Sequence, residues 1–291
     1  MRDPFSEIER GQLVFAHRLL ESRPLSIRIC DTLGMPVDAL MTLLPQKAVD
    51  SVQAVTRRCL DKALSVALKT LDREPLKPSR DRLHKGFVLA SGFAGGLAGF
   101  AGLALEAPVA TVAMLRSIAD IARSEGARLN DPETMLECLQ VFALSGGTRI
   151  EGALPGYYAV RGLLSRNLGD AVAHLTTRTL AEESSAVLAR FVASVAERFS
   201  VNITEKFAAQ SAPLLGAAGG ATVNYIFISH FQDIARGHFT VKRLEAAHGA
   251  AAVQEAYRRL SDDPDGEPIG PRGARSKTAA PPRRKTKRAR P

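Results

Sequence analysis

An uncharged stretch of twenty residues, Gly86 to Leu105, limits most strongly what this chain can fold into. Six of its residues are glycine and five are alanine, and small residues recur at four-residue spacing as Ser91, Gly95 and Gly99. In a helix this spacing places the small residues on one ridge, along which a second helix can approach closely. The stretch therefore predicts a tightly packed apolar helix.

A second uncharged stretch runs from Phe207 to Ser229 and has the same spacing of small residues at Ala212, Gly216 and Gly220. Two ridged helices of this kind can pack against each other at short range. We expect them to form the centre of an all-α helical bundle.

The first stretch is also long enough to cross a membrane, since twenty helical residues extend about 30 Å. Its eight Leu, Val and Phe residues favour insertion by about −4 kcal/mol in all. Its glycines oppose this by up to about 1 kcal/mol each in helix propensity. The balance favours burial in a helical core and leaves membrane insertion as the alternative.

Apolar periodicity elsewhere predicts further helices, and no alternating strand pattern occurs. The expected helices are residues 4–22, two short helices within 25–44, 46–72, 108–124, one beginning at Asn130–Asp131, 170–199 and 240–260. Residues 148–171 are expected to be turns, and Gly237 is expected to interrupt the last part of the chain. Pro108 is placed in the first turn of its helix, where the helix dipole would stabilise Glu106 just ahead of it.

The net positive charge of the chain lies in its C-terminal tail. Nine of the 39 Lys and Arg residues lie in residues 272–291, which contain no Asp or Glu, so residues 1–271 balance 30 basic against 30 acidic residues. The tail is rich in Pro and lacks aromatic residues, and this composition predicts disorder. We therefore divide the chain into N-terminal helices and a hinge (1–80), a helical core (81–260) and a disordered basic tail (261–291).

The three cysteines are scattered as Cys30, Cys59 and Cys138, with no CxxC spacing. An odd, unpatterned set is typical of a reducing compartment and argues against a disulfide framework or a zinc knuckle. The N-terminal residues include early acidic side chains and no continuous apolar region, so we expect no secretory signal and a cytoplasmic protein. No pattern indicates a cofactor or a metal ion.

Common catalytic motifs are missing from the sequence. The glycine-rich segments are not followed by Lys and Ser or Thr, which excludes a phosphate-binding loop, and no GxSxG or HExxH motif occurs.

The best polar cluster contains Asn224, His230, Asp233 and His238. His230 and Asp233 share one helix face and could act as a His–carboxylate pair or bind a metal, with Glu106 as a further candidate carboxylate. The alternative is that Asp233 pairs with Arg236 or with a neighbouring helix, while the histidines lie at the edge of that ion pair.

The basic tail can bind an anionic surface by charge alone. Its six most closely spaced cations are Arg283, Arg284, Lys285, Lys287, Arg288 and Arg290. Such a cluster is attracted to anionic lipid, and it can also bind nucleic acid through phosphate contacts. Without aromatic residues it has no platforms on which bases could stack.

Several segments together resemble the EcsC family of bacterial proteins. They are Pro213–Asn224, His230–Phe239, Glu106–Pro108 and Leu115–Ala122, together with the first glycine-rich stretch, and the resemblance covers residues 45–258. It implies an all-helical protein and transfers no catalytic residues.

Two functions follow as hypotheses. The first is a non-enzymatic helical accessory protein that associates with the cytoplasmic face of the inner membrane or with a membrane complex, at its surface or inserted in it. The second is a hydrolase or metal-dependent enzyme that uses His230 and Asp233.

Overall fold

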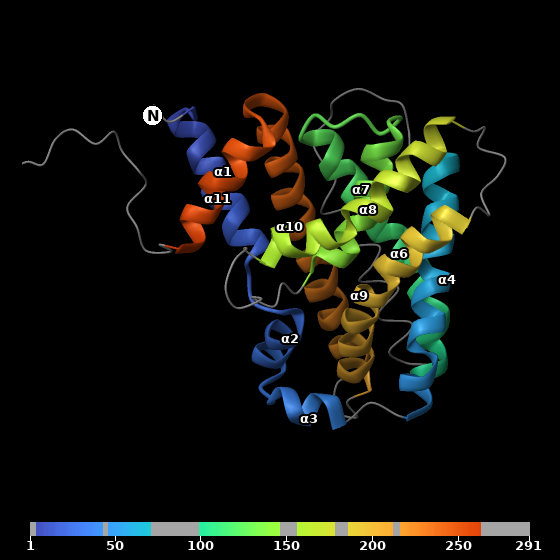
Figure 1. Ribbon diagram of the computed structural model, residues 1–291. Coiled ribbons are helices and arrows are strands. Elements are labelled where there is room, and N and C mark those ends of the chain that lie inside the picture. The colour runs from blue at the N-terminus through green and yellow to red at the C-terminus, as the bar shows by residue number, and fades with distance from the viewer. Residues whose placement is uncertain are drawn as a thin grey trace, which may run out of the picture.

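Every regular element in the described part of the chain is an α-helix (Figure 1). The computed structural model describes residues 4–42, 46–70, 99–145, 156–177, 186–211 and 216–262. The helices are α1 (Glu7–Leu20), α2 (Leu25–Leu33), α3 (Val37–Thr42), α4 (Gln46–Thr70), α6 (Gly99–Ser124), α7 (Pro132–Leu144), α8 (Gly156–Thr177), α9 (Ala186–Gln210), α10 (Gly216–His248) and α11 (Ala250–Asp262). The predicted all-α fold is confirmed. Of the predicted tail, residues 261 and 262 belong to α11, and residues 263–291 lie outside the described residues.

Helix α10 is the central element of the bundle. It has 33 residues, which corresponds to a length of about 50 Å, and it contacts α1, α2, α6, α7, α9 and α11. Between Ile226 and Val241 only Asp233 and Arg236 are partly exposed. A helix segment that is buried on most sides is typical of the middle of a core, so most polar side chains on this segment are enclosed by the protein.

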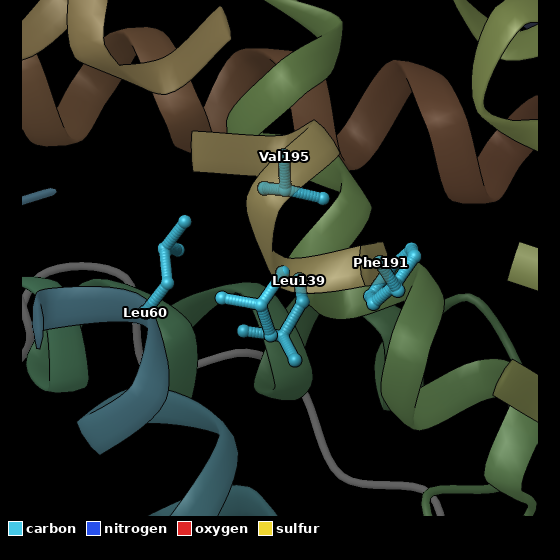
Figure 2. Close-up of a pocket in the computed structure, with 5 residues that line it drawn as sticks. Leu60, Leu139, Phe191 and Val195 are labelled. Carbon is cyan, nitrogen blue, oxygen red and sulfur yellow. The ribbon is translucent and has the colours of Figure 1, made fainter. Parts of the chain in front are cut away.

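Helix α4 packs against α6 and α9, away from α1 and α11, which lie on the other side of the molecule in Figure 1. Figure 2 shows Leu60 of α4 facing Leu139 of α7 and the α9 residues Phe191 and Val195. The gap between these apolar side chains has no room for a water molecule. The junction of the three helices is therefore closely packed core.

Local signals fix two helix starts near the residues that the sequence predicts: α1 begins at Glu7 instead of residue 4, and α7 begins directly after Asp131. Ser6 and Glu9 form a capping box at the start of α1. Asp131 caps α7 by accepting a hydrogen bond from the backbone N–H of Thr134, and Pro132 is the first helical residue. These signals are local because the groups that satisfy the first N–H groups of a helix come from the same turn.

The helices in the two glycine-rich stretches begin and end at other residues than predicted. Residues 86–98 lie outside the described part of the chain, and residues 99–105 continue into α6 instead of ending a helix at Leu105. In the second stretch α9 ends at Gln210 and α10 begins at Gly216, so the predicted single helix is wrong. Pro213, which has no N–H for a helical hydrogen bond, falls in the interval between them.

The packing of the two stretches against each other is described only in part. Helices α6 and α10 are in contact, and Gln232 donates a hydrogen bond of 2.7 Å from Nε2 to Ser117 Oγ between them. On the predicted ridges Gly220 is buried. Gly99 and Gly216 begin α6 and α10, but their surroundings are not described, and Ser91, Gly95 and Ala212 lie outside the described residues.

Pro108 lies inside α6 and does not begin a new helix, so Glu106 is not at a helix N-terminus as predicted. A proline in a helix interior costs about 3 kcal/mol because it removes one hydrogen bond and crowds the preceding turn. The buried residues that follow it, including Met114, Leu115 and Ile118, offset this cost, since each contributes on the order of 1.5–3 kcal/mol. Tertiary packing overrides the local signal.

The predicted turn at 148–171 is also wrong, because residues 156–177 form α8. Gly162 and Gly169 lie within this helix, and a side chain at either position would meet nothing within 4 Å. Each glycine costs about 1 kcal/mol of helix propensity. Burial of Tyr157 and Leu164 against the bundle outweighs that cost.

Gly237 does not interrupt the chain as predicted, because α10 runs through it to His248 and the break occurs at Gly249, whose φ is 85°. Gly237 instead lets α1 approach closely. A Cβ atom built at Gly237 would lie 2.7 Å from Leu20 Cγ and 3.1 Å from the carbonyl oxygen of Ala16. The glycine is therefore needed for the contact between α1 and α10.

We predict that Gly237→Ala destabilises the protein relative to Gly162→Ala. Both variants gain the same helix propensity, but only the first inserts a methyl group into the contact with α1, which costs about 1–3 kcal/mol. Urea denaturation of both variants measures the difference. Equal midpoints would show that α1 can move away from α10 without cost.

Candidate functional site

The predicted pair His230 and Asp233 lies on one face of α10, as expected from their spacing, and both side chains contact Arg28 of α2. Arg28 Nη1 lies 3.1 Å from His230 Nδ1 and 3.3 Å from Asp233 Oδ2. His230 is buried, whereas Asp233 is partly exposed. Asp233 thus forms an ion pair with a neighbouring helix, as the alternative to a catalytic pair expects, and its partner is Arg28 of α2.

The other ring nitrogen of His230 faces a polar pair from two further helices. His230 Nε2 lies 2.5 Å from the Oγ atom of Ser145, which follows the last residue of α7. Ser145 Oγ in turn lies 2.9 Å from Asn202 Oδ1 on α9. All three side chains are buried, and together with Arg28 and Asp233 we call them the His230 cluster.

The direction of every hydrogen bond in the His230 cluster follows from Arg28. A guanidinium can only donate, so Nδ1 of His230 accepts and the ring proton sits on Nε2. Nε2 then donates to Ser145 Oγ, and the Ser145 hydroxyl donates to Asn202 Oδ1. This assignment gives each of the three bonds one donor and one acceptor.

This arrangement is the reverse of the one that activates a serine nucleophile. In a Ser–His–Asp triad, Nε2 accepts the serine proton while Nδ1–H donates to a carboxylate. Here Nε2 carries the proton, and Nδ1 faces a cation. Burial, together with the charge of Arg28, lowers the pKa of His230 to about 3. The ring is therefore neutral near pH 7 and a weak base, and its Nε2 already carries a proton, so no lone pair of that nitrogen is available to the proton of Ser145.

The remaining predicted residues do not converge on the His230 cluster. Asn224 accepts a hydrogen bond of 3.3 Å from Gln210 on α9, and His238 contacts Tyr157 of α8. The side chain of Glu106 is not described. Among the described residues, no group of three or more His, Cys, Asp and Glu side chains could hold a metal ion.

A second buried network, which we call the Tyr157 cluster, joins α8 to α10. Tyr157 OH lies 2.8 Å from His238 Nδ1, and Arg161 binds Glu245 with two hydrogen bonds of 2.8 and 2.7 Å. Tyr158 OH donates to the same carboxylate at 3.0 Å. Two parallel bonds between a guanidinium and a carboxylate are among the strongest that side chains form.

Burial decides the protonation states in the Tyr157 cluster. It raises the pKa of Tyr157 and Tyr158 and lowers the pKa of His238 well below its usual value. Both phenols and the imidazole are therefore neutral at pH 7. The cluster contains no group poised to exchange a proton in that range, and it is suited to hold helices together.

The sequence gives no signal for Arg28, Ser145 or Asn202. They lie 202, 85 and 28 residues from His230 and belong to no motif. Tyr157 and Tyr158 carry a misleading signal, because the preceding Pro155 and Gly156 suggest a turn. Only the arrangement of the helices brings these residues together.

The cysteines are free and buried, as expected from their apolar neighbours. Burial raises the pKa of the Cys59 thiol to about 11 and raises that of Cys138 as well. A nucleophilic cysteine needs its thiolate form, so neither thiol is reactive near neutral pH.

An open hollow lies on the surface at the start of α7, lined by Arg128, Asn130, Asp131, Pro132 and Thr134. The Asp131 carboxylate already caps the helix there, and none of these residues belongs to the His230 cluster. Within the described residues, no helix has the length and hydropathy of a membrane span.

The fold and the site together define an all-helical protein whose central polar residues bind one another inside the bundle. The model of the EcsC protein family matches residues 22–244, which is most of the chain. The protein therefore belongs to the EcsC family, and the resemblance found in the sequence is confirmed, although the match begins and ends earlier than expected. Searches of curated proteins and of solved structures gave no match.

We predict that His230 makes stability depend on pH. Below pH 6.5 the unfolded chain takes up a proton at this residue that the folded chain, with its pKa near 3, does not. The free energy of unfolding therefore falls as the pH drops, by on the order of 3 kcal/mol at pH 4. Urea denaturation at pH 7 and pH 4 should show a smaller loss for His230→Gln than for the wild type.

The control for this measurement is His174→Gln, which removes a histidine from a partly exposed position on α8. It should keep the wild-type dependence on pH. If His230→Gln kept it too, the folded protein would not be holding His230 neutral.

We also predict that NMR finds the ring proton of His230 on Nε2. The ¹⁵N shifts of the imidazole at pH 7 distinguish the two tautomers. Arg28→Leu removes the donor to Nδ1 and should allow the other tautomer to appear. If the wild-type proton were on Nδ1, Nε2 would be free to accept from Ser145, and the enzyme hypothesis would gain support.

Proposed function

We propose that this EcsC-family protein is a non-enzymatic accessory protein that associates with the cytoplasmic face of a bacterial membrane or with a membrane complex. Its helical body serves as a rigid packing unit, and its basic tail binds the anionic surface. The observation that carries the proposal is the separation of charge along the chain. Residues 1–271 hold 30 basic and 30 acidic residues, whereas residues 272–291 hold nine basic residues and no acidic ones.

Charge of this kind acts without a folded site. Each Lys or Arg near an anionic lipid surface contributes about 1 kcal/mol. Several such residues together support reversible binding that weakens as salt is added, because salt screens charge over about 10 Å at 0.1 M. The tail therefore provides a peripheral anchor for a body that has no net charge of its own.

The geometry of the His230 cluster supports the non-enzymatic part of the proposal. Arg28 fixes the ring in the orientation that donates to Ser145, and all three central side chains are closed to solvent. Ser145 is therefore not open to a substrate in this structure. The hydrolase or metal-dependent enzyme using His230 and Asp233 remains an alternative hypothesis that no contact in the described residues favours.

We predict that the full-length protein sediments with vesicles containing phosphatidylserine at 50 mM salt and is released at 500 mM salt. It should not sediment with vesicles of phosphatidylcholine alone. The matched control is the full-length chain with Arg283, Arg284, Lys285, Lys287, Arg288 and Arg290 changed to glutamine, which keeps the folded body unchanged. Its binding to anionic vesicles should drop at least tenfold.

Three outcomes would contradict this proposal. Sedimentation that resists both high salt and alkaline carbonate would indicate that a glycine-rich stretch is inserted in the bilayer. Equal binding by the glutamine variant would remove the role of the tail. Retardation of DNA or RNA at salt concentrations that already release the vesicles would identify nucleic acid as the preferred partner.

A further inference from the structure

Helix α1 is firmly attached to the bundle although it lies outside residues 22–244, the part that matches the family. Its inner face buries Leu13, Ala16 and Leu20 and makes the close contact at Gly237. Near its start, Glu9 binds His248 at the end of α10 with a distance of 2.7 Å between Oε1 and Nε2. The orientation of α1, and therefore of its outer face, is fixed by these contacts.

The outer face of α1 carries two of the most exposed large apolar side chains in the described residues. Ile8 is 75% exposed and Phe15 is 50% exposed, and they lie seven residues apart on the same side of the helix. Gly11 lies between them, and a Cβ atom there would meet nothing within 4 Å. Glu7 and Arg18 are exposed at opposite ends of the same face. We call these five residues the α1 outer face.

Gly11 has no local reason to be glycine. It does not adopt a positive φ, and in a helix interior glycine is less stable than alanine by about 0.5–1 kcal/mol. No other part of the described chain approaches it. A helix interior tolerates such a cost where another backbone comes close, as α1 does at Gly237.

We propose that the α1 outer face binds the same face of a second copy of this protein, with the two helices antiparallel about a twofold axis near Gly11. In this arrangement Ile8 of one copy packs against Phe15 of the other. Glu7 at one end then faces Arg18 at the other end of the partner helix. The face is complementary to itself in shape and charge, which a twofold contact requires.

The charges on this face favour a second copy over a lipid surface. An apolar helix face that lies on an anionic membrane is typically bordered by Lys and Arg, whereas this one has an acidic residue at one end and a basic residue at the other. Opposite charges at the two ends instead select an antiparallel partner. The inference is independent of the proposed function, because it uses no residue of the tail.

The size of the face sets the strength of the contact. Helix α1 has 14 residues, or about 21 Å, so two such helices bury less than the roughly 1,000 Å² typical of stable interfaces. The contact is therefore a weak, reversible dimer that forms at high local concentration. Binding to a surface through the tails would raise that concentration.

Cross-linking at Gly11 tests the position of the twofold axis. The native cysteines are buried, so Gly11→Cys introduces an exposed thiol where two copies meet. Under mild oxidation at 100 µM protein, this variant should form a disulfide-linked dimer at least tenfold faster than Leu163→Cys, whose residue is exposed on α8. Equal rates would overturn the proposal.

Charge reversal tests the pairing of the two ends. Glu7→Arg and Arg18→Glu should each weaken the dimer several-fold in sedimentation velocity, whereas an equimolar mixture of the two should restore it, because each charge then meets its opposite.

Phe15→Glu should remove the dimer at concentrations where the wild type associates. If Phe15→Glu lowered binding to vesicles and left sedimentation unchanged, the face would contact lipid and the proposal would fail. The glutamine variant of the tail should dimerise like the wild type, so failure of this inference and failure of the proposed function are distinguishable.

Discussion

The burial of α10 between Ile226 and Val241, where only Asp233 and Arg236 are partly exposed, is the constraint on which the rest of the structure depends. A buried polar group that lacks a partner costs about 1–3 kcal/mol, and this helix carries several polar residues in its buried part. Three of them bind side chains outside the helix: His230 binds Ser145, Gln232 binds Ser117 and His238 binds Tyr157. These bonds have defined directions, so they select one arrangement of helices among the many that would bury a similar apolar area.

The same constraint decides what the histidines can do. A buried imidazole without a carboxylate partner is stable only in its neutral form. The positive charges of Arg28 at His230 and of Arg161 near His238 lower the pKa of each ring further. His230 and His238, which belong to the best candidate cluster in the sequence, therefore connect helices. Side chains that a partner could contact lie on the surface of the molecule, where charged groups and exposed apolar side chains are not needed to hold the helices together.

The helices α1 and α11 illustrate how parts outside the family match become part of one structure. They contact each other and α10, and Tyr257 of α11 donates a hydrogen bond of 3.0 Å to Glu21, just after α1. His17 and Ser261 lie 2.8 Å apart across the same contact. The segments before and after the matched region thus form one unit on one side of the bundle, and this unit presents the outer face of α1.

Features that depend on neighbouring residues in the chain could be predicted. The capping box of α1 and the Asp131 cap of α7 follow from interactions within one turn, and the apolar periodicity of residues 46–72 predicts α4, which is Gln46–Thr70. Pro108 and Gly237 could not be predicted, because each acts against its local preference where packing offsets the cost. The same holds for the glycines of α8.

The sequence by itself determined that this protein is all-helical, that it belongs to the EcsC family and that its excess positive charge lies in the tail, because periodicity, motif and charge are properties of the order of residues. Only the tertiary structure decided which way the ring of His230 points and what surrounds it. Arg28 lies on α2, Asn202 lies on α9 and Ser145 follows the last residue of α7, and no motif in the sequence indicates that the three lie close together. The direction of their hydrogen bonds is set by which groups can donate, and that depends on contacts formed only when the helices pack.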